Sequence, residues 1–305
     1  MRIGLTGGAG SVDRIVEQAR RAEADGFSSL WYASSVRGDP LVAMSIAGRQ
    51  TSIIELGTAV LQTYPCHPLL LANRAAAVVD AMGRPGFTLG IGPSHEALVN
   101  GVYGLSYDHP GRNTREYVDV LTTLLAGDEV DYSGEDWSVH TGGRTVSTAH
   151  RIPVLLAALG PNLLRVAGDY ADGVVLWMAP PRAVATHVVP KLFAAAEAAG
   201  RPTPRVVAGL PVAVHDDVAE ARAAVAATSS GYSGMANYAR ILDIGGASSA
   251  AEAAIVGDAA SVRRQLHGLI DAGATDVWAA IVPVGENPRD SIRRTRDVLR
   301  ELLTS

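Results

Sequence analysis

Three stretches of the chain share one order of polar and apolar positions: an amphipathic segment, then a glycine, then a short apolar run. They are EADGFSSLWY (23–32), DYADGVVLWM (169–178) and DAGATDVWAA (271–280). Ahead of the first glycine, Ile15 and Ala19 lie one helical turn apart, and glycine is the residue at which helices commonly end. The apolar runs have the length of buried strands. Helix, glycine and strand in repeated order predict parallel βα units.

Eight segments of the chain have the character of buried strands. They are Arg2–Leu5, Ser29–Tyr32, Glu55–Leu61, Phe87–Ile91, Val154–Ala157, Gly173–Trp177, Val206–Val214 and Val277–Val282. Eight parallel strands with helices between them, in a chain of 305 residues, favour a closed (β/α)8 barrel of the α/β class. An open, doubly wound sheet is the alternative.

Two connections are longer than a plain strand-to-helix turn. Residues 101–150, after the fourth strand, contain a helical pattern around Thr114–Leu125 and a hairpin pattern in EVDYSGEDWSV. Residues 229–257, after the seventh strand, are rich in glycine, serine and alanine. No linker-like composition separates these stretches from the rest, so we interpret both as insertions into one domain over residues 1–305.

The composition narrows the classes of partner. The net charge is −5 and no basic block occurs, which argues against nucleic acid and anionic membranes as partners. Cys66 is the single cysteine, so no intrachain disulfide can form, and the N-terminus lacks the pattern of a secretory signal. We therefore expect a cytoplasmic protein that acts on a small molecule, and the apolar barrel helices are compatible with a homodimer.

In a (β/α)8 barrel the chemistry lies where the strands end at their carboxyl sides. Those positions carry no cluster of metal ligands, no paired carboxylates and no lysine suited to a Schiff base, so no metal site is predicted. Small residues, aromatic rings and a few hydroxyl and imidazole groups remain. Such a mouth suits a flat cofactor that brings its own reactivity.

Two strand ends carry the most specific signals. In FTLGIGPSHEALVNGVYG (87–104), Gly90 and Gly92 leave space for a ring, and His95 follows the turn Gly92-Pro93-Ser94. After the fifth strand, Gly160-Pro161-Asn162 begins a helix whose free N–H groups can hold a phosphate. A tight turn with no ligand would account for either pattern alone.

The joint pattern resembles the luciferase-like flavin or deazaflavin oxidoreductases, and within them the actinobacterial-type F420-dependent branch. The resemblance is carried by ELGTAVLQTYPCHP (55–68), FTLGIGPSHEALVNGVYGLSYDHPGR (87–112), VLLAALGPNLLRVAGDYADGVVLWM (154–178), AGRPTPRVVAGLPVAVHDD (199–217) and GDAASVRRQLHGLIDAGATD (257–276). It implies a (β/α)8 barrel that binds coenzyme F420 in its mouth.

The resemblance also implies roles for particular residues. Backbone contacts to the deazaflavin are expected at Val60, Gln62 and Thr63, and a phosphate is expected at Ala158, Leu159 and Gly160. Gly92, Pro93, Ser94 and His95 would face cofactor and substrate. From the other strand ends, Gly7, Ser34 and Trp177 complete the predicted cofactor-binding set.

His95 is the first candidate for a catalytic residue, and Tyr64 and His67 are the next. The remaining histidines are expected on the surface or in the insertions; they are His109, His140, His150, His187, His215 and His267. Three tryptophans at strand ends fit a core layer as well as walls that stack on a ring; they are Trp31, Trp177 and Trp278.

Two departures from the family pattern bear on the reaction. Gly83-Arg84-Pro85-Gly86-Phe87 replaces the Gly-Gly-Arg-Phe that often precedes the fourth strand in relatives, and Ala33-Ser34-Ser35 replaces an acidic and imidazole pair after the second. Without that pair, a dehydrogenation that requires a strong base is less favoured than a reduction.

We therefore expect an F420-dependent oxidoreductase of the reductase type, in which hydride passes from reduced F420 C5 to an activated C=C or C=N bond, and His95 or Tyr64 supplies a proton. The alternatives are an FMN-dependent luciferase-like monooxygenase, a cofactor-binding protein without turnover, and an unrelated phosphate-binding barrel lyase or isomerase. The substrate cannot be named from the insertions.

Overall fold

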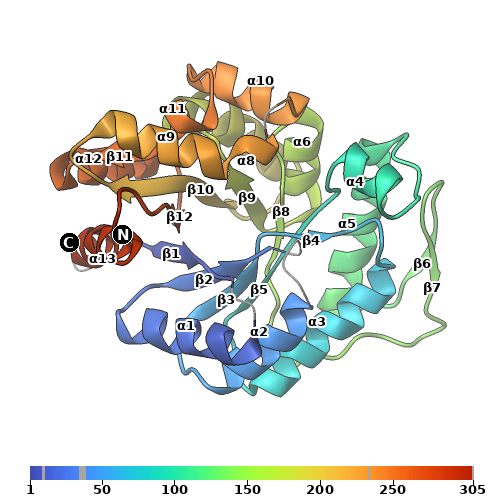
Figure 1. Ribbon diagram of the computed structural model, residues 1–305. Helices are drawn as coiled ribbons and strands as arrows, with labels where there is room; N and C mark the ends of the chain where they lie inside the picture. Colours follow the sequence, from blue (N-terminus) through green and yellow to red (C-terminus); the bar gives the residue numbers. More distant parts are fainter. Residues whose placement is uncertain (9–10, 34–38, 233, 304–305) are drawn as a thin grey trace.

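The computed structural model describes residues 1–8, 11–33, 39–232 and 234–303 (Figure 1). Within them, eight parallel strands form a closed ring, because the last strand pairs with the first through Ile3 opposite Val277. In order around the ring they are β1 (Ile3–Thr6), β2 (Ser29–Tyr32), β3 (Glu55–Thr58), β5 (Phe87–Gly92), β8 (Val154–Leu156), β9 (Gly173–Trp177), β10 (Arg205–Val214) and β12 (Asp276–Ile281). The predicted (β/α)8 barrel is confirmed, and the open sheet is excluded.

Helices surround this ring (Figure 1). They are α1 (Val12–Ala24), α2 (Pro40–Arg49), α3 (Pro68–Met82), α4 (Glu96–Gly101), α5 (Pro110–Ala126), α6 (Pro161–Tyr170), α7 (Pro181–Ala183), the π-helix η1 (Val184–Val188), α8 (Val189–Ala198), α9 (Val218–Thr228), the 3-10 turn η2 (Ser230–Tyr232), α10 (Ala236–Gly245), α11 (Ala250–Ala253), α12 (Ala259–Asp271) and α13 (Pro288–Glu301). None of the described helices is both long enough and apolar enough to cross a membrane.

Both predicted insertions are present. The first begins at the end of α4 and contains α5 and an antiparallel hairpin of β6 (Asp131–Ser133) and β7 (Ser138–His140), which stands beside α5 at the edge of the molecule (Figure 1). The second contains η2, α10 and α11, and it ends in β11 (Ile255–Gly257), which adds to the outer part of β10. The sequence pattern did not predict β11, because a three-residue strand carries too little periodicity to be recognised.

The third strand is broken where the sequence predicted a continuous run to Leu61. β3 ends at Thr58, the peptide between Ala59 and Val60 is cis, and β4 (Leu61–Gln62) resumes the pairing with β5. At the break, the Thr58 hydroxyl donates to the Gly90 carbonyl (2.7 Å) and accepts from the Gly90 N–H (2.8 Å).

The expectation that Gly90 leaves space for a cofactor ring is wrong. A Cβ at that position would overlap the Thr58 carbonyl oxygen, so Gly90 lacks a side chain to let the third strand approach, and it does not line the cavity of the barrel. Gly92, two residues further along β5, does line the cavity.

Large aromatic side chains fill the interior of the barrel. Trp31 is fully buried there beside Leu155, Val175 and Val207, so it belongs to the core layer. A Cβ at Gly57 would overlap the Trp31 ring, so the missing side chain makes room for the indole. The tryptophan is thus packed inside the barrel, below the strand ends where chemistry was expected.

Four charged side chains join the amino-terminal ends of the barrel strands. Arg205, at the start of β10, donates to both carboxylate oxygens of Glu55 (2.6 and 3.0 Å) and of Asp276 (2.6 and 2.9 Å). Arg2 donates to the same two carboxylates at 2.8 Å each. The Arg205 guanidinium also lies 5.6 Å from the centre of the Trp31 ring. We name Arg2, Glu55, Arg205 and Asp276 the basal charge cluster.

Burial by itself would raise the pKa of Asp276, but hydrogen bonds and charge from Arg205 and a hydrogen bond from Arg2 outweigh it, so the pKa is lowered. A carboxyl with a lowered pKa in the folded state stabilises the fold above its unfolded pKa, and this contribution is lost as the pH falls through the folded pKa. The basal charge cluster therefore stabilises the barrel at neutral pH.

Replacing Arg205 with methionine is expected to lower the free energy of unfolding at pH 7 by about 3 kcal/mol, because the buried Asp276 and the partly buried Glu55 lose their main partner. Urea unfolding followed by circular dichroism measures this. The deficit should shrink at acidic pH, where the unpaired carboxylates take up protons. Arg294→Met, which breaks an exposed pair with Asp216, is the matched control and should change little. Equal effects of both variants would contradict a structural role for the cluster.

Candidate active site

A cavity of about 910 Å³ opens at the carboxyl ends of the barrel strands. Most of the predicted site residues line it; they are Val60, Gln62, Gly92, Pro93, Ser94, His95, Ala158, Leu159, Gly160 and Trp177. Its volume is that of a site for a sizeable organic ligand, and it lies where barrels of this class carry their chemistry.

Four predicted residues do not line the cavity, and Ser34 is outside the described residues. Gly7 packs against Tyr32, whose ring leaves no space for a Cβ at that position. Thr63 is fully buried, and its N–H donates to the Gly92 carbonyl at 3.0 Å. Tyr64 and His67 also lie outside the lining, so the structure does not bring them together with His95.

Three histidines of the described chain are N-cap residues of helices, namely His67, His95 and His109, and the first two behave differently. The Nδ1 atom of His67 accepts from the Leu69 N–H at 3.3 Å and so caps α3, while its ring packs edge-on against Trp137 at 5.6 Å. The side chain of His95 makes no capping bond at α4. Its imidazole instead lines the cavity.

The turn before His95 has an unusual backbone. Ser94 adopts a left-handed conformation with φ of 66°, which is uncommon for a residue with a side chain, and its carbonyl accepts from the Tyr107 hydroxyl at 2.9 Å. The Tyr107 ring also contacts Tyr64, with 5.2 Å between ring centres. Tyr64 thus contacts the lining residue Tyr107 without lining the cavity itself.

Burial sets the titration behaviour of these rings. Burial lowers the pKa of His95, so its imidazole is mainly neutral at pH 7. Burial, together with the neighbouring Tyr107, raises the pKa of Tyr64 to about 12, and burial with Glu96 raises that of Tyr107 to about 12. Both phenols keep their protons across the physiological range.

The amino end of α6 faces the cavity after β8. Gly160 is the N-cap residue and no side chain caps the helix, so its first N–H groups are open to a ligand. The Nε2 atom of His187 lies 2.9 Å from the Leu159 carbonyl oxygen and fixes this loop. His187 was expected on the surface or in an insertion, but it is buried, because η1 packs it against the loop.

The sequence reasoning missed several lining residues. They are Tyr107, Tyr232, Asn237, Tyr238 and Arg240, which all come from the two insertions. The only signal that could have found the two later tyrosines is that they are the only aromatic residues between positions 229 and 257.

Aromatic rings form a continuous arc on one wall of the cavity. Trp278 and Trp177 are 5.1 Å apart, Trp177 and Tyr232 are 6.2 Å apart, and Tyr232 and Tyr238 are 5.1 Å apart, measured between ring centres. The Trp278 indole donates to the Thr6 hydroxyl at 2.7 Å, which fixes one end of the arc. Trp177 and Trp278 are therefore walls of the cavity, in contrast to Trp31.

The lining carries very little charge. Among the described residues, Arg240 is the only lysine, arginine, aspartate or glutamate that lines the cavity, and it donates to the neutral Asn237 amide oxygen at 2.5 Å. A Cβ on Gly160 would lie 3.3 Å from its Nη2 atom. The guanidinium and the open amino end of α6 thus give this end of the cavity a positive potential.

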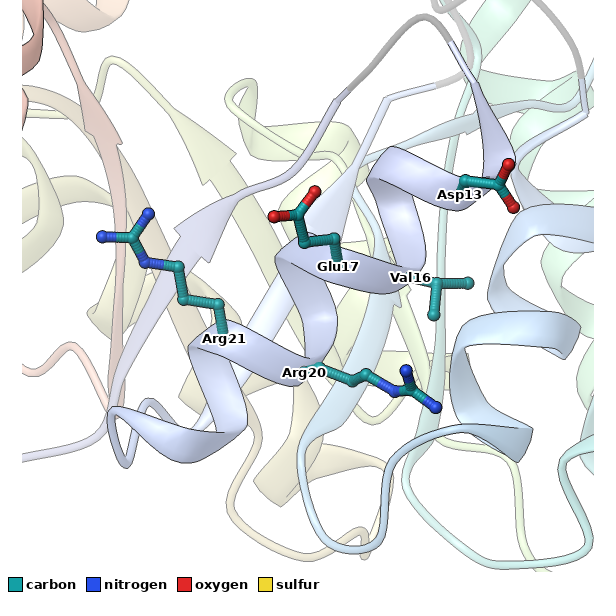
Figure 2. A pocket seen from close by; sticks show the side chains of 5 residues that line it. All are labelled: Asp13, Val16, Glu17, Arg20 and Arg21. Carbon is teal, nitrogen blue, oxygen red and sulfur yellow. The ribbon is translucent and has the colours of Figure 1, made fainter.

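A second hollow, of about 530 Å³, lies on the outer side of α1 (Figure 2). Asp13, Val16, Glu17, Arg20 and Arg21 line it, and Figure 2 shows the acidic and basic side chains spread along one helix and pointing apart. All but Val16 are exposed, and no strand end contributes to it, so it is a solvated helix face rather than a candidate site.

Two known proteins illustrate the similarity of this chain in sequence to other proteins. The chain is 26% identical over 309 residues to a 5,10-methylenetetrahydromethanopterin reductase of Methanolobus tindarius, which covers 92% of this chain and 93% of the relative. It is 29% identical over 227 residues to an F420-dependent hydroxymycolic acid dehydrogenase of Mycobacterium tuberculosis, which covers 70% of this chain and 62% of the relative.

Solved structures match the fold. The coenzyme F420 dependent tetrahydromethanopterin reductase from Methanopyrus kandleri superposes with a TM-score of 0.77 at 22% identity, with 97% of each chain covered. An F420-dependent secondary alcohol dehydrogenase, solved with an F420-acetone adduct, gives a TM-score of 0.79 at 18% identity, again with 97% of each covered.

The family resemblance predicted from the residues is confirmed by a sequence model of the family described as luciferase-like monooxygenase, which matches residues 1–303. Because this match spans nearly the whole chain of 305 residues, the chain belongs to the luciferase-like monooxygenase family.

Proposed function

We propose that this chain is an F420-dependent oxidoreductase, and that it works as a reductase on a small organic substrate with an activated C=C or C=N bond. The observation that carries the proposal is the cavity itself, in which a nearly uncharged, aromatic wall meets one positive end. The described lining residues include no aspartate, glutamate or lysine, so the protein offers little reactivity of its own and depends on a cofactor.

The residues present fit coenzyme F420. The cavity has the volume for a tricyclic ring, and Gly92 keeps the wall at β5 open, since a Cβ there would approach Ala157 to 2.9 Å and Val60 to 3.1 Å. Val60, Gln62 and Gly92 would border the ring. The loop Ala158–Gly160 and the amino end of α6 would hold the phosphate. Bound there, reduced F420 would supply hydride at its C5 atom.

His95 is the side chain best placed to move the proton that accompanies the hydride. It is the only histidine that lines the cavity among the described residues, and its imidazole is not engaged in capping α4. Protonated at Nδ1 or Nε2, it can donate to the atom of the substrate that gains negative charge. Tyr64 does not reach the cavity, but its ring contacts Tyr107, which does. As a second candidate for the proton donor, Tyr64 could therefore act only through Tyr107.

The relatives favour F420 over FMN as the cofactor, since several of them are named as F420-dependent enzymes. Titrations of oxidised F420, FMN and NADPH against the purified protein test this directly. We expect tight binding of F420, and anaerobic oxidation of reduced F420 by an unsaturated acceptor with stoichiometric reduced product. Turnover only with reduced FMN and oxygen, with an oxygen atom entering the product, would establish the monooxygenase alternative instead.

Gly160→Asp is expected to weaken F420 binding by at least tenfold, because a fixed carboxylate would occupy the anion site and pair with Arg240. Fluorescence titration of F420 measures the affinity. Gly160→Ala is the matched control, since its methyl group meets only the movable tip of Arg240 and should have a small effect. Normal affinity in the aspartate variant, with the fold intact by circular dichroism, would disprove a phosphate site at this loop.

His95→Ala is expected to reduce the single-turnover rate of the bound complex by about 10²-fold with near-normal F420 affinity, as general acid catalysis typically contributes 10²–10⁴-fold. Because burial lowers the pKa of His95, the wild-type reductive rate should rise as the pH falls below about 6.5, and this rise should vanish in the variant.

His67→Gln is the control for that experiment. His67 caps α3 outside the cavity, so its replacement should affect thermal stability more than the rate. If His95→Ala lost F420 affinity and kept its bound-state rate, His95 would position the cofactor instead of donating a proton.

A further inference from the structure

The imidazole of His95 lies near an aromatic ring from the second insertion. Tyr238 of α10 lies 5.8 Å from it, measured between ring centres, with 52° between the ring planes. Tyr238 in turn packs edge-on against Tyr232 of η2, at 5.1 Å and 76°. Figure 1 shows α4 and α10 on the same side of the barrel, although about 140 residues of chain separate them.

No hydrogen bond within the described part of the chain orients the imidazole. Neither of its nitrogens has a hydrogen-bond partner there, and the side chain does not cap α4. A histidine side chain has two rotatable bonds, so a proton donor that must meet a substrate needs some contact to select one rotamer. The tilted ring of Tyr238 is the contact available for this.

Helices α4 and α10 carry three charged residues, Glu96, Arg240 and Asp243, and none of them is a cause of the pKa shift of His95. On its own helix the neighbouring acid is Glu96, which is exposed to solvent. From the loop before α5 comes Tyr107, and from α10 comes Tyr238; burial raises the pKa of both phenols, so both are neutral at pH 7. Desolvation therefore governs the titration of His95, and burial lowers its pKa.

We propose that Tyr238 is a positioning residue that holds the His95 imidazole against the cavity wall and excludes water from it, so that the insertion 229–257 completes the active site. Its catalytic consequence rests on the proposed function, whereas its effect on His95 is a property of the protein without any cofactor.

The proposal gives different expectations for three substitutions. Tyr238→Phe keeps the ring, so His95 should be unaffected. Tyr238→Ala opens the imidazole to water, so the pKa of His95 should move up toward its ordinary value of about 6.5. Tyr238→Leu keeps apolar volume for the packing of α10 but loses the ring face, so it tests orientation if the alanine variant fails to fold.

The first measurement is an NMR titration of the labelled imidazoles in the cofactor-free protein. We expect the pKa of His95 to rise in Tyr238→Ala and to stay unchanged in Tyr238→Phe. The exposed His140 serves as the internal reference. Tyr132→Ala is the matched control, because Tyr132 is a half-buried tyrosine of the other insertion that does not line the cavity. An unchanged pKa of His95 in a folded Tyr238→Ala protein would overturn the proposal.

The second measurement is the single-turnover rate with reduced F420. We expect Tyr238→Ala and Tyr238→Leu to lose about tenfold in rate with unchanged F420 affinity, and Tyr238→Phe to keep the wild-type rate. In Tyr238→Ala the rise in rate at low pH should begin at a higher pH. A wild-type protein that does not bind F420 would refute the proposed function, but the NMR result would still decide the role of Tyr238.

Discussion

The basal charge cluster is the constraint on which the rest of this structure depends. Arg205 binds Glu55 and Asp276 at the amino-terminal ends of three different barrel strands, and Arg2 binds the same pair. Asp276 is buried and Glu55 and Arg205 are partly buried, and charges in such surroundings are stable only when they are partnered. The cluster therefore favours the meeting of these strands at this end of the ring. The opposite end of the ring carries the cavity, whose described lining is nearly uncharged.

The cavity at that opposite end is built in two layers. The inner layer consists of backbone and small residues at the strand ends, such as Gly92 and Gly160, with Trp177 and Trp278 as fixed walls. The outer layer comes from the insertions and adds tyrosines and the single cavity-lining guanidinium of the described residues, Arg240. We interpret the inner layer as the part that would hold the proposed cofactor, and the outer layer as the part that would adapt the site to one substrate.

Three buried or helix-capping histidines differ in whether their ring nitrogens form hydrogen bonds within the protein. A ring nitrogen of His67 forms a hydrogen bond with the backbone at the start of α3, and a ring nitrogen of His187 forms one with the backbone of the loop after β8. His95 occupies a similar N-cap position to that of His67, yet its ring lies free of hydrogen bonds to described residues, against Tyr238 and beside the cavity. Its ring nitrogens are therefore available to a ligand in the cavity, which is why His95 is the residue we expect to exchange the proton.

The amino-acid sequence alone determined the strands, the barrel and the glycine loop before α6, because these depend on short-range signals: apolar runs, glycine at helix ends and the order of helix and strand. Tertiary structure alone decided the rest. The break in β3, the role of Gly90, the burial of His187 and the arc of Tyr232 and Tyr238 all arise from contacts between residues distant in the chain. Local periodicity cannot encode such contacts, since whether a ring meets its partner depends on how separate elements are packed around the closed barrel.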